Sequence, residues 1–258
     1  MATETSWRAD KATLLLAVLV VAACASTAAN PPPAEHTPLP EAVSAPEPIA
    51  APDEASVKPG INDPYFQDDG LDRYTRVLEA ESREIVRRKS DIVRAIGLRE
   101  GMVAADIGAG TGLLTLDMAE RVGSDGVVYA VDIVPAFLDR IRERVAAAGV
   151  DNVVVIEGGE RSTGLESASL DLAFMCDTYH HIEYPDPYLF SLFQTLRPGG
   201  TLVLVDMKRP EQTSSSRLRE HVRADKATVI AEIEAAGFVF DSEIEILRWN
   251  YYLRFRRP

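Results

Sequence analysis

The sequence predicts an α/β domain with a doubly wound sheet that is parallel except at its C-terminal end. Three observations predict this fold. Short apolar runs alternate with segments of helical periodicity from about residue 72 onward, a glycine-rich turn follows the first apolar run, and two strand-like runs stand together at the end of the chain. Alternating strands and helices produce a parallel sheet covered on both faces.

The elements follow one another in a regular order. Buried parallel strands are nearly continuous in Val, Ile, Leu and Ala, and such runs occupy 102–107, 127–133, 153–157, 170–176 and 201–206. Apolar residues at helical spacing predict helices over 78–96, which should end near Gly97, and over 113–122, 136–148, 187–196 and 227–236. The last two runs, 238–247 and 251–256, are joined by a short link and should be antiparallel neighbours.

The first residues have the layout of a secretory leader. An apolar run over 12–23 follows Arg8 and Lys11 and is shorter than the roughly 20 residues that a membrane-spanning helix needs. The tetrapeptide Val21-Ala-Ala-Cys24 resembles the bacterial lipobox. That resemblance implies a lipoprotein signal peptide over 1–23, a lipid on Cys24 and a membrane-anchored protein facing the periplasm. An ordinary signal peptide with a chance cysteine is one alternative, and a cytoplasmic protein whose leader does not function is another.

A proline-rich tether and an acidic domain follow the leader. Nine prolines lie between residues 25 and 60, so 24–60 should form an extended, disordered spacer and the folded domain should cover 61–258. The formal net charge is −13. Nucleic acid is therefore not an expected partner, because phosphate binding requires a basic surface.

The glycine-rich turn predicts a binding site for an adenosine-containing ligand. The run Asp106-Ile-Gly108-Ala-Gly110-Thr-Gly112 follows a predicted strand and opens a helix, and Asp132 ends the next strand. Glycines allow the sharp turn and the close approach of a ligand, and the carboxylate of Asp132 can accept hydrogen bonds from two ribose hydroxyls.

S-adenosylmethionine fits this turn better than NAD does. A dinucleotide fold has its third small residue one position later, where this chain has Leu113. Asp106 would repel a pyrophosphate but could accept a hydrogen bond from the ammonium group of S-adenosylmethionine. An NAD-dependent oxidoreductase is therefore the weaker alternative.

Four segments resemble the successive motifs of class I methyltransferases: 103–112, 128–133, Asp177-Thr-Tyr-His-His181 and Leu196-Arg-Pro-Gly-Gly200. The resemblance implies a Rossmann-like sheet of seven strands in the order 3-2-1-4-5-7-6, with strand 7 antiparallel. It also implies that the cofactor contacts Asp106, Gly108, Gly110 and Asp132, and that Ile133 packs on the adenine. Many family members carry, after strand 3, an Asp that meets the adenine amino group. This chain has Glu160 in that region, and the resemblance implies that Glu160 takes this role.

The loop after the fourth strand supplies the candidate catalytic residues. Ligands of doubly wound sheets bind beyond the carboxyl ends of the strands, so Asp177, His180 and His181 should face the transferred methyl group. A histidine there could act as base for a hydroxyl acceptor. These three residues could also hold a metal, but the sequence offers no clear further ligand, so none is expected.

The predicted function is methyl transfer from S-adenosylmethionine to a small-molecule acceptor. Export would separate the protein from cytoplasmic S-adenosylmethionine. A noncatalytic module at the membrane, binding the cofactor or a partner, therefore remains an alternative.

Overall fold

The computed structural model describes residues 55–67, 69–209 and 220–258. The predicted signal peptide, Cys24 and the tether up to residue 54 lie outside the described residues, so these stay predictions. Among the described residues, no helix combines the length and apolar character needed to cross a membrane.

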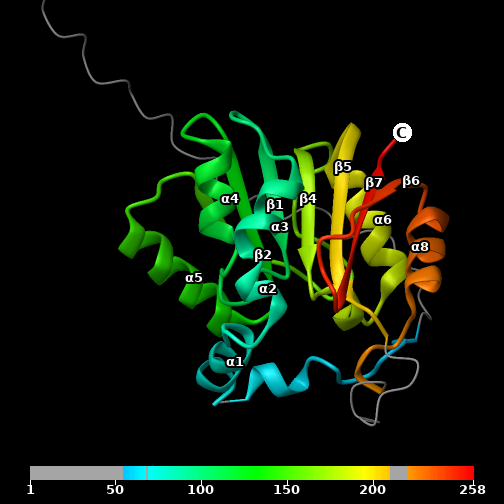
Figure 1. Ribbon diagram of the computed structural model, residues 1–258, viewed down its shortest axis with the longest axis horizontal. Helices are drawn as coiled ribbons and strands as arrows, with labels where there is room; N and C mark the ends of the chain where they lie inside the picture. Colours follow the sequence, from blue (N-terminus) through cyan, green and yellow to red (C-terminus); the bar gives the residue numbers. More distant parts are fainter. Residues whose placement is uncertain (1–54, 68, 210–219) are drawn as a thin grey trace, which may run out of the picture. The chain divides into compact units, whose positions relative to one another are not determined.

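One seven-stranded sheet forms the centre of the domain (Figure 1). Its order is β3-β2-β1-β4-β5-β7-β6, and β7 runs antiparallel to both of its neighbours. The predicted strand order and the predicted antiparallel strand are therefore confirmed. The strands are β1 Val103–Ile107, β2 Val127–Asp132, β3 Val153–Glu157, β4 Leu170–Cys176, β5 Leu196–Met207, β6 Val239–Glu243 and β7 Asn250–Arg256.

Helices cover both faces of the sheet, each over its own apolar core. One core joins the sheet to α6 (Pro185–Thr195) and α8 (Lys226–Ala235), and the other joins it to α3 (Lys89–Ile96) and α4 (Thr115–Val122). The strands alternate between the two cores, as the pleat requires: Ala105 and Ile107 of β1 face the first, and Ala104 faces the second. The other helical elements in the part of the chain that the structure describes are η1 Asp63–Phe66, α1 Gly70–Leu78, α2 Glu84–Arg87, α5 Pro135–Ala148 and η2 Tyr179–His181.

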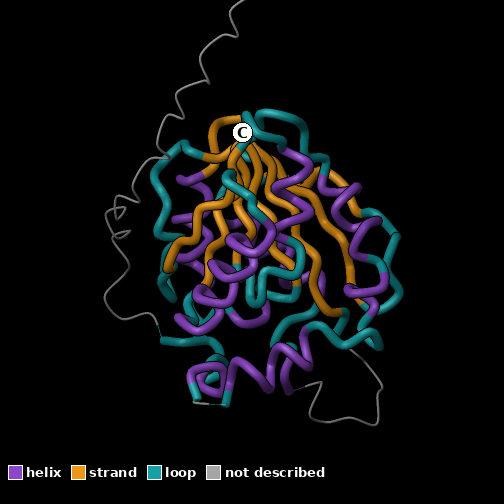
Figure 2. Tube along the Cα trace, turned by 90° about the vertical axis from the view of Figure 1, so that its left-hand side faces the viewer, coloured by secondary structure: helices purple, strands orange, loops and turns teal. Residues whose placement is uncertain are grey.

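The segment that precedes the sheet crosses the carboxyl ends of its strands. η1 and α1 lie together below the sheet in Figure 1, and the view turned by 90° in Figure 2 shows helical segments at the same end. Attachment begins earlier than residue 61. The Ser56 hydroxyl donates to the Glu183 carboxylate at 2.6 Å, and the Val57 N–H donates to the Glu183 carbonyl at 2.9 Å.

The helix predicted over 78–96 is broken into separate pieces, so that prediction was wrong in its first half. α1 ends at Leu78, and Arg83 has an extended backbone before α2 begins. The Arg83 guanidinium donates to the Leu78 carbonyl at 2.6 Å and also binds Asp177. This cation occupies the break, which periodicity alone does not reveal. The predicted end at Gly97 is confirmed by its left-handed conformation, φ 84°.

The C-terminal strands also differ in their limits. β5 begins at Leu196, directly after α6, and includes the Arg-Pro-Gly-Gly run that precedes the strand predicted over 201–206. β6 ends at Glu243, so the hairpin connection is longer than the expected short link. Neither difference changes the topology.

Candidate active site

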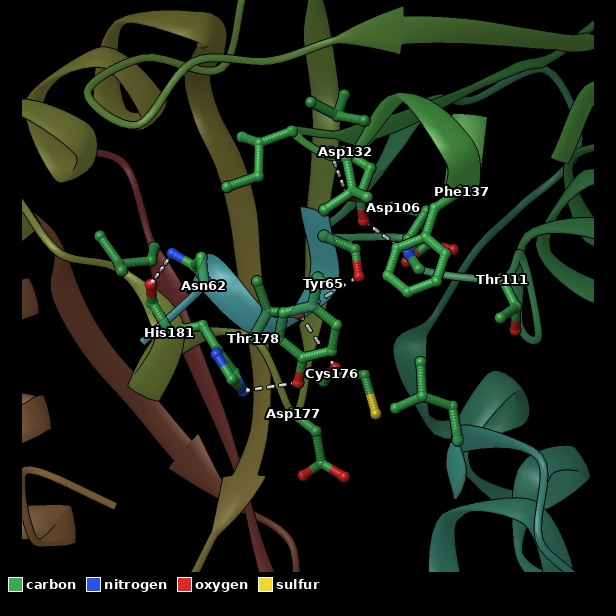
Figure 3. A pocket seen from close by; sticks show the side chains of 18 of the residues that line it. Asn62, Tyr65, Asp106, Thr111, Asp132, Phe137, Cys176, Asp177, Thr178 and His181 are labelled. Carbon is green, nitrogen blue, oxygen red and sulfur yellow. Dashed lines mark hydrogen bonds between the residues drawn. The ribbon is translucent and has the colours of Figure 1, made fainter. Parts of the chain in front are cut away.

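A cavity with about 1110 Å³ of empty space, part of it open to solvent, lies beyond the carboxyl ends of β1, β2 and β4. Its walls come from the glycine-rich turn, from the loops after β2, β3 and β4, and from the N-terminal segment (Figure 3). Among the sequence-predicted residues, Asp106, Gly108, Gly110, Asp132, Ile133, Glu160, Asp177 and His181 line it, and Gly112 and His180 do not.

Gly108 and Gly110 hold the turn in a conformation that side chains disfavour. Both have positive φ, 68° and 55°. A Cβ on Gly108 would lie 2.2 Å from Thr178 Cγ2, so the turn can pack against the loop after β4 only with glycine there. Gly112 faces away from the cavity, toward Ile141 of α5 at 3.1 Å from its ideal Cβ. In the structure, Gly112 packs against the Ile141 side chain.

Asp132 ends β2 with its carboxylate at the cavity wall. Its two oxygens accept the N–H groups of Gly110 at 2.7 Å and Val134 at 2.9 Å. The residue is 7% exposed, and burial raises its pKa to about 6. Each carboxylate oxygen can accept more than one hydrogen bond, so both retain capacity for a ligand.

Asp106 is a second buried carboxylate at the same wall. It is 3% exposed and accepts the Thr115 hydroxyl at 2.7 Å. Burial raises its pKa to about 6, the Thr115 hydrogen bond opposes this rise, and the nearby charge of Asp132 adds to it.

S-adenosylmethionine fits this end of the cavity. Its ammonium and sulfonium groups are cationic and its ribose donates hydroxyl hydrogens, which are the partners that two buried carboxylates accept. The same pair of acids would repel a pyrophosphate. Thr111 Oγ1 is buried in this wall without a hydrogen-bond partner among the described residues and offers one more polar contact.

Ile133 and Glu160 border the cavity from the loops after β2 and β3. These positions agree with the predicted contacts to the adenine. The contacts themselves stay predictions.

Asp177 lines the cavity, but its carboxylate is occupied by protein partners. Arg83 binds one oxygen, and Asn250 Nδ2 donates to the other at 2.5 Å. Burial raises the pKa of Asp177, and Arg83 opposes that rise. Its φ of 51° is unusual for a residue other than glycine. This residue connects the loop after β4 to the N-terminal segment and to β7.

His180 and His181 have different environments although they are adjacent in sequence. His180 is 4% exposed, its Nδ1 lies 2.6 Å from Asp206 Oδ1, and its backbone N–H donates to Asp206 Oδ2 at 3.0 Å. Burial lowers the pKa of His180, but the Asp206 carboxylate opposes this effect, and the net shift of the pKa is upward. His181 turns its ring to the cavity, where Nε2 lies 3.4 Å from the Tyr65 hydroxyl (Figure 3). Burial and the neighbouring His180 and His221 hold its pKa well below the usual range.

Sequence reasoning missed the residues that the N-terminal segment brings to the site. Asn62 Nδ2 donates to the His181 carbonyl at 3.0 Å. The ring of Tyr65 lies 5.4 Å from that of His181 and 5.9 Å from that of Phe137, measured between centroids. These residues follow a proline-rich stretch and show no pattern that assigns them to a site. Only the fold reveals that this segment covers the cavity.

The sheet has the class I methyltransferase fold, and the glycine-rich turn and the paired acids at its carboxyl edge fit S-adenosylmethionine as the cofactor. Residues 104–200 match a protein family described as a methyltransferase domain. A solved structure of an S-adenosylmethionine-dependent methyltransferase from Aquifex aeolicus is 25% identical with a TM-score of 0.66, covering 72% of this chain and 98% of that one.

Two relatives are similar in sequence over part of their length. A ubiquinone/menaquinone biosynthesis C-methyltransferase from Idiomarina loihiensis is 29% identical over 115 residues, covering 44% of this chain and 46% of that protein. A demethylmenaquinone methyltransferase from Staphylococcus aureus is 28% identical over 142 residues, covering 54% of this chain and 56% of that protein. The chain thus spans about half the length of these relatives.

Proposed function

We propose that the protein transfers a methyl group from S-adenosylmethionine to a small-molecule acceptor that loses a proton. The observation that carries this proposal is the position of His181. Its ring faces the same cavity as Asp106 and Asp132, which would hold the cofactor. The site therefore combines a cofactor wall with a proton acceptor.

The apolar lining supports a small acceptor with an apolar or ring-shaped body. Leu78, Ile85, Leu113, Phe137 and Tyr188 contribute to the walls. Cavities of this kind bind small molecules through mostly apolar walls and a few placed polar groups. One relative is named as a C-methyltransferase of ubiquinone/menaquinone biosynthesis, and another as a demethylmenaquinone methyltransferase. A hydroxyl-bearing ring would attack through carbon or oxygen once its proton is removed, so either product is consistent with a base in the wall.

The chain's own residues would position the two reactants. S-adenosylmethionine, when bound, supplies the methyl group on a sulfonium. Asp132 and Asp106 would hold the ribose and the ammonium group at the cavity wall. His181 accepts the proton of the acceptor, and Tyr65 and Asn62 cover the cavity against water. Holding donor and acceptor in line is the main contribution of the enzyme to such a transfer.

We further propose that Cys24 carries a lipid and that the proline-rich stretch up to residue 54 tethers the domain at the periplasmic side of a membrane. The lipobox-like Val21-Ala-Ala-Cys24 and the prolines that follow it support this location. Attachment of Ser56 and Val57 to Glu183 would bring the tether to the domain beside the loop after β4. A leader that does not function would leave a cytoplasmic enzyme.

Export favours one second candidate, a noncatalytic module that binds the cofactor or a partner. It would keep the acids and the glycine-rich turn but methylate nothing. The two candidates are separated by incubating the purified full chain with methyl-labelled S-adenosylmethionine and an extract of its own envelope.

The His181→Gln variant tests the proposed base. We expect turnover to fall by about 100- to 10,000-fold. Affinity for S-adenosylhomocysteine, measured by calorimetry, should change less than about twofold because the paired acids remain. His36→Gln is the matched control, since it replaces the histidine farthest from the site in sequence.

Full turnover in His180→Gln, in His181→Gln and in the double variant would remove both histidines from the mechanism. Tight cofactor binding by the wild type without methylation of any envelope component would favour the noncatalytic module.

A further inference from the structure

Three histidines from two separate segments meet beside the cavity. His180 and His181 come from η2, and His221 follows the segment 210–219. The ring centroids lie 4.3 Å apart for His180 and His181, 4.9 Å for His180 and His221, and 5.0 Å for His181 and His221. One nitrogen from each ring can be chosen so that all three lie within 4.8 Å of one another.

We propose that His180, His181 and His221 bind one divalent transition-metal ion at the edge of the methyl-transfer cavity. Imidazole nitrogens are ligands that zinc, copper, nickel and iron accept. Zinc–nitrogen bonds of about 2.0 to 2.1 Å place the nitrogens of a tetrahedral site about 3.4 Å apart. The observed spacing therefore requires an inward movement of each ring by roughly 1 Å or less.

The carboxylate behind His180 is the partner that a metal-binding histidine usually has. Asp206 Oδ1 lies 2.6 Å from His180 Nδ1, which leaves Nε2 for the metal. Such a hydrogen bond fixes the tautomer and the ring orientation. Asp206 also accepts the backbone N–H groups of His180 and Met207, so the carboxylate is itself held in place.

His181 provides an independent indication of a ligand. Its Nδ1 is buried and has no hydrogen-bond partner among the described residues. Buried polar nitrogens are rarely left without a partner, and a bound ion would satisfy this one. The other nitrogen, Nε2, lies 3.4 Å from the Tyr65 hydroxyl on the cavity wall (Figure 3).

The segment around His221 is anchored on both sides. The carbonyl of Glu220 accepts a hydrogen bond from the Lys58 ammonium group. Arg223 binds the Glu232 carboxylate through two nitrogens, at 2.8 and 2.7 Å, and the Tyr179 hydroxyl donates to the same carboxylate at 2.6 Å. These contacts hold the third ligand close to η2. The sequence alone predicts no metal because a further ligand is lacking there, and the fold supplies it.

A metal at this place would favour methyl acceptors that carry a group able to bind the ion. This consequence rests on the proposed methyl transfer. Three protein ligands leave a coordination position for water or substrate. Since His181 lines the cavity, an acceptor with a hydroxyl or thiol could reach that position. The hydroxyl proton would pass to solvent, the oxygen lone pair would form the new O–CH₃ bond, and the S–CH₃ bond would break with its electron pair on sulfur. With the ion bound through Nδ1, His181 carries its ring proton on Nε2 and cannot accept another, so the ion would take over the activation of the acceptor from His181. The methyl transfer of the proposed function is kept, and only the group that activates the acceptor changes.

Metal binding is tested without turnover, on the full chain purified without a polyhistidine tag and stripped with a chelator. We expect one Zn²⁺ per chain by competition with a chromophoric chelator, and visible absorption bands of Co²⁺ in a low-symmetry site. His221→Gln should weaken Zn²⁺ binding at least about 100-fold and abolish the cobalt bands. Asp206→Asn should weaken it about 10- to 100-fold, the range for carboxylates behind metal-binding histidines. His36→Gln should bind as the wild type does.

Equal Zn²⁺ affinity in wild type and His221→Gln, or substoichiometric uptake by the wild type, would overturn the proposal. Calorimetry of the metal-free variants with S-adenosylhomocysteine shows whether they are folded. It also separates the two proposals, because loss of methyl transfer with intact Zn²⁺ binding would contradict only the proposed function.

Discussion

At the residue scale, the predicted cofactor end of the cavity depends on two carboxylates that already accept hydrogen bonds from the protein. Asp132 accepts two backbone N–H groups, and Asp106 accepts the Thr115 hydroxyl. These hydrogen bonds therefore fix the orientation of both carboxylates, and the oxygens can still accept further hydrogen bonds from a ligand. A preformed acceptor of this kind binds without the entropy loss of ordering a free side chain.

The Asp132→Asn variant tests this assignment. The amide keeps the size of the side chain but removes its charge and one acceptor oxygen. We expect affinity for S-adenosylhomocysteine to fall by about 1.5 to 3 kcal/mol, the range for hydrogen bonds to a charged group. Glu157→Gln is the matched control, because Glu157 pairs with Asp132 in the register of β3 and β2 but is exposed. Unchanged calorimetric affinity in a folded Asp132→Asn protein would refute the ribose contact.

Cofactor affinity should also depend on pH. Burial raises the pKa of Asp106 and of Asp132 to about 6 in the free protein. Both must be ionised to accept the ligand's hydrogen bonds, so affinity should fall as the pH drops below 6. The expected slope is about tenfold per pH unit for each carboxylate that must lose its proton. Calorimetry between pH 5 and 7 measures it, and an affinity independent of pH over that range would contradict the charged contacts.

The free energy of unfolding should respond with the opposite sign. A carboxyl whose pKa rises from its ordinary value of 3.8 to about 6 binds a proton in the folded state that the unfolded state lacks between those values. Folding is then favoured as the pH falls from 6 toward 4. Urea unfolding of the ligand-free wild type and Asp132→Asn checks this, because the variant lacks one such group and should gain less stability on acidification.

At the scale of elements, the glycine-rich turn and the loop after β4 form one packed unit. The turn approaches Thr178 so closely that Gly108 has no room for a side chain, and the Thr178 hydroxyl donates to the Gly108 carbonyl at 3.3 Å. The loop that carries the histidines is therefore positioned by the turn that is predicted to hold the cofactor. If the two loops hold donor and acceptor as proposed, this contact would fix the separation of the two.

Gly108→Ala should disturb this unit, and Gly149→Ala is its matched control. Both glycines have positive φ, 68° and 62°, so both variants share the cost of left-handed backbone. Only Gly108 faces another side chain, since nothing lies within 4 Å of an ideal Cβ on Gly149. We expect Gly108→Ala to lose about 1 to 3 kcal/mol more unfolding free energy than the control, the usual cost of overpacking. Equal loss in urea unfolding would mean that the turn does not depend on this contact.

Sequence patterns predict the parts of this domain whose chemistry is local. The strand runs, the turn from Asp106 to Gly112 and the acid at Asp132 follow from apolar periodicity and spacing. The break at Arg83 does not follow, because its cause is an ion pair with Asp177, which lies far along the chain. The approach of Tyr65 and His221 to the site also depends on long-range packing. Sequence separation, and not the kind of residue, therefore marks the limit of prediction here.

At the scale of the whole molecule, location decides which function the domain can perform. An exported domain needs an external source of S-adenosylmethionine, whereas a cytoplasmic one has the cofactor at hand. The prediction that separates these cases concerns Cys24, which lies outside the described residues. The other cysteine, Cys176, stands at the end of β4 as a free thiol.

Cells expressing the wild type with labelled palmitate should yield a labelled protein in the membrane fraction that has lost residues 1–23. Two acyl chains suffice for stable anchoring, because each buried CH₂ contributes about 0.8 kcal/mol. Cys24→Ser should take up no label and keep its leader, whereas Cys176→Ser should be labelled as the wild type is. A soluble wild-type protein with Met1 intact and no label would instead place the enzyme in the cytoplasm. In that case the cofactor supply would no longer argue for a noncatalytic module, and the search for the acceptor would move to cytoplasmic extracts.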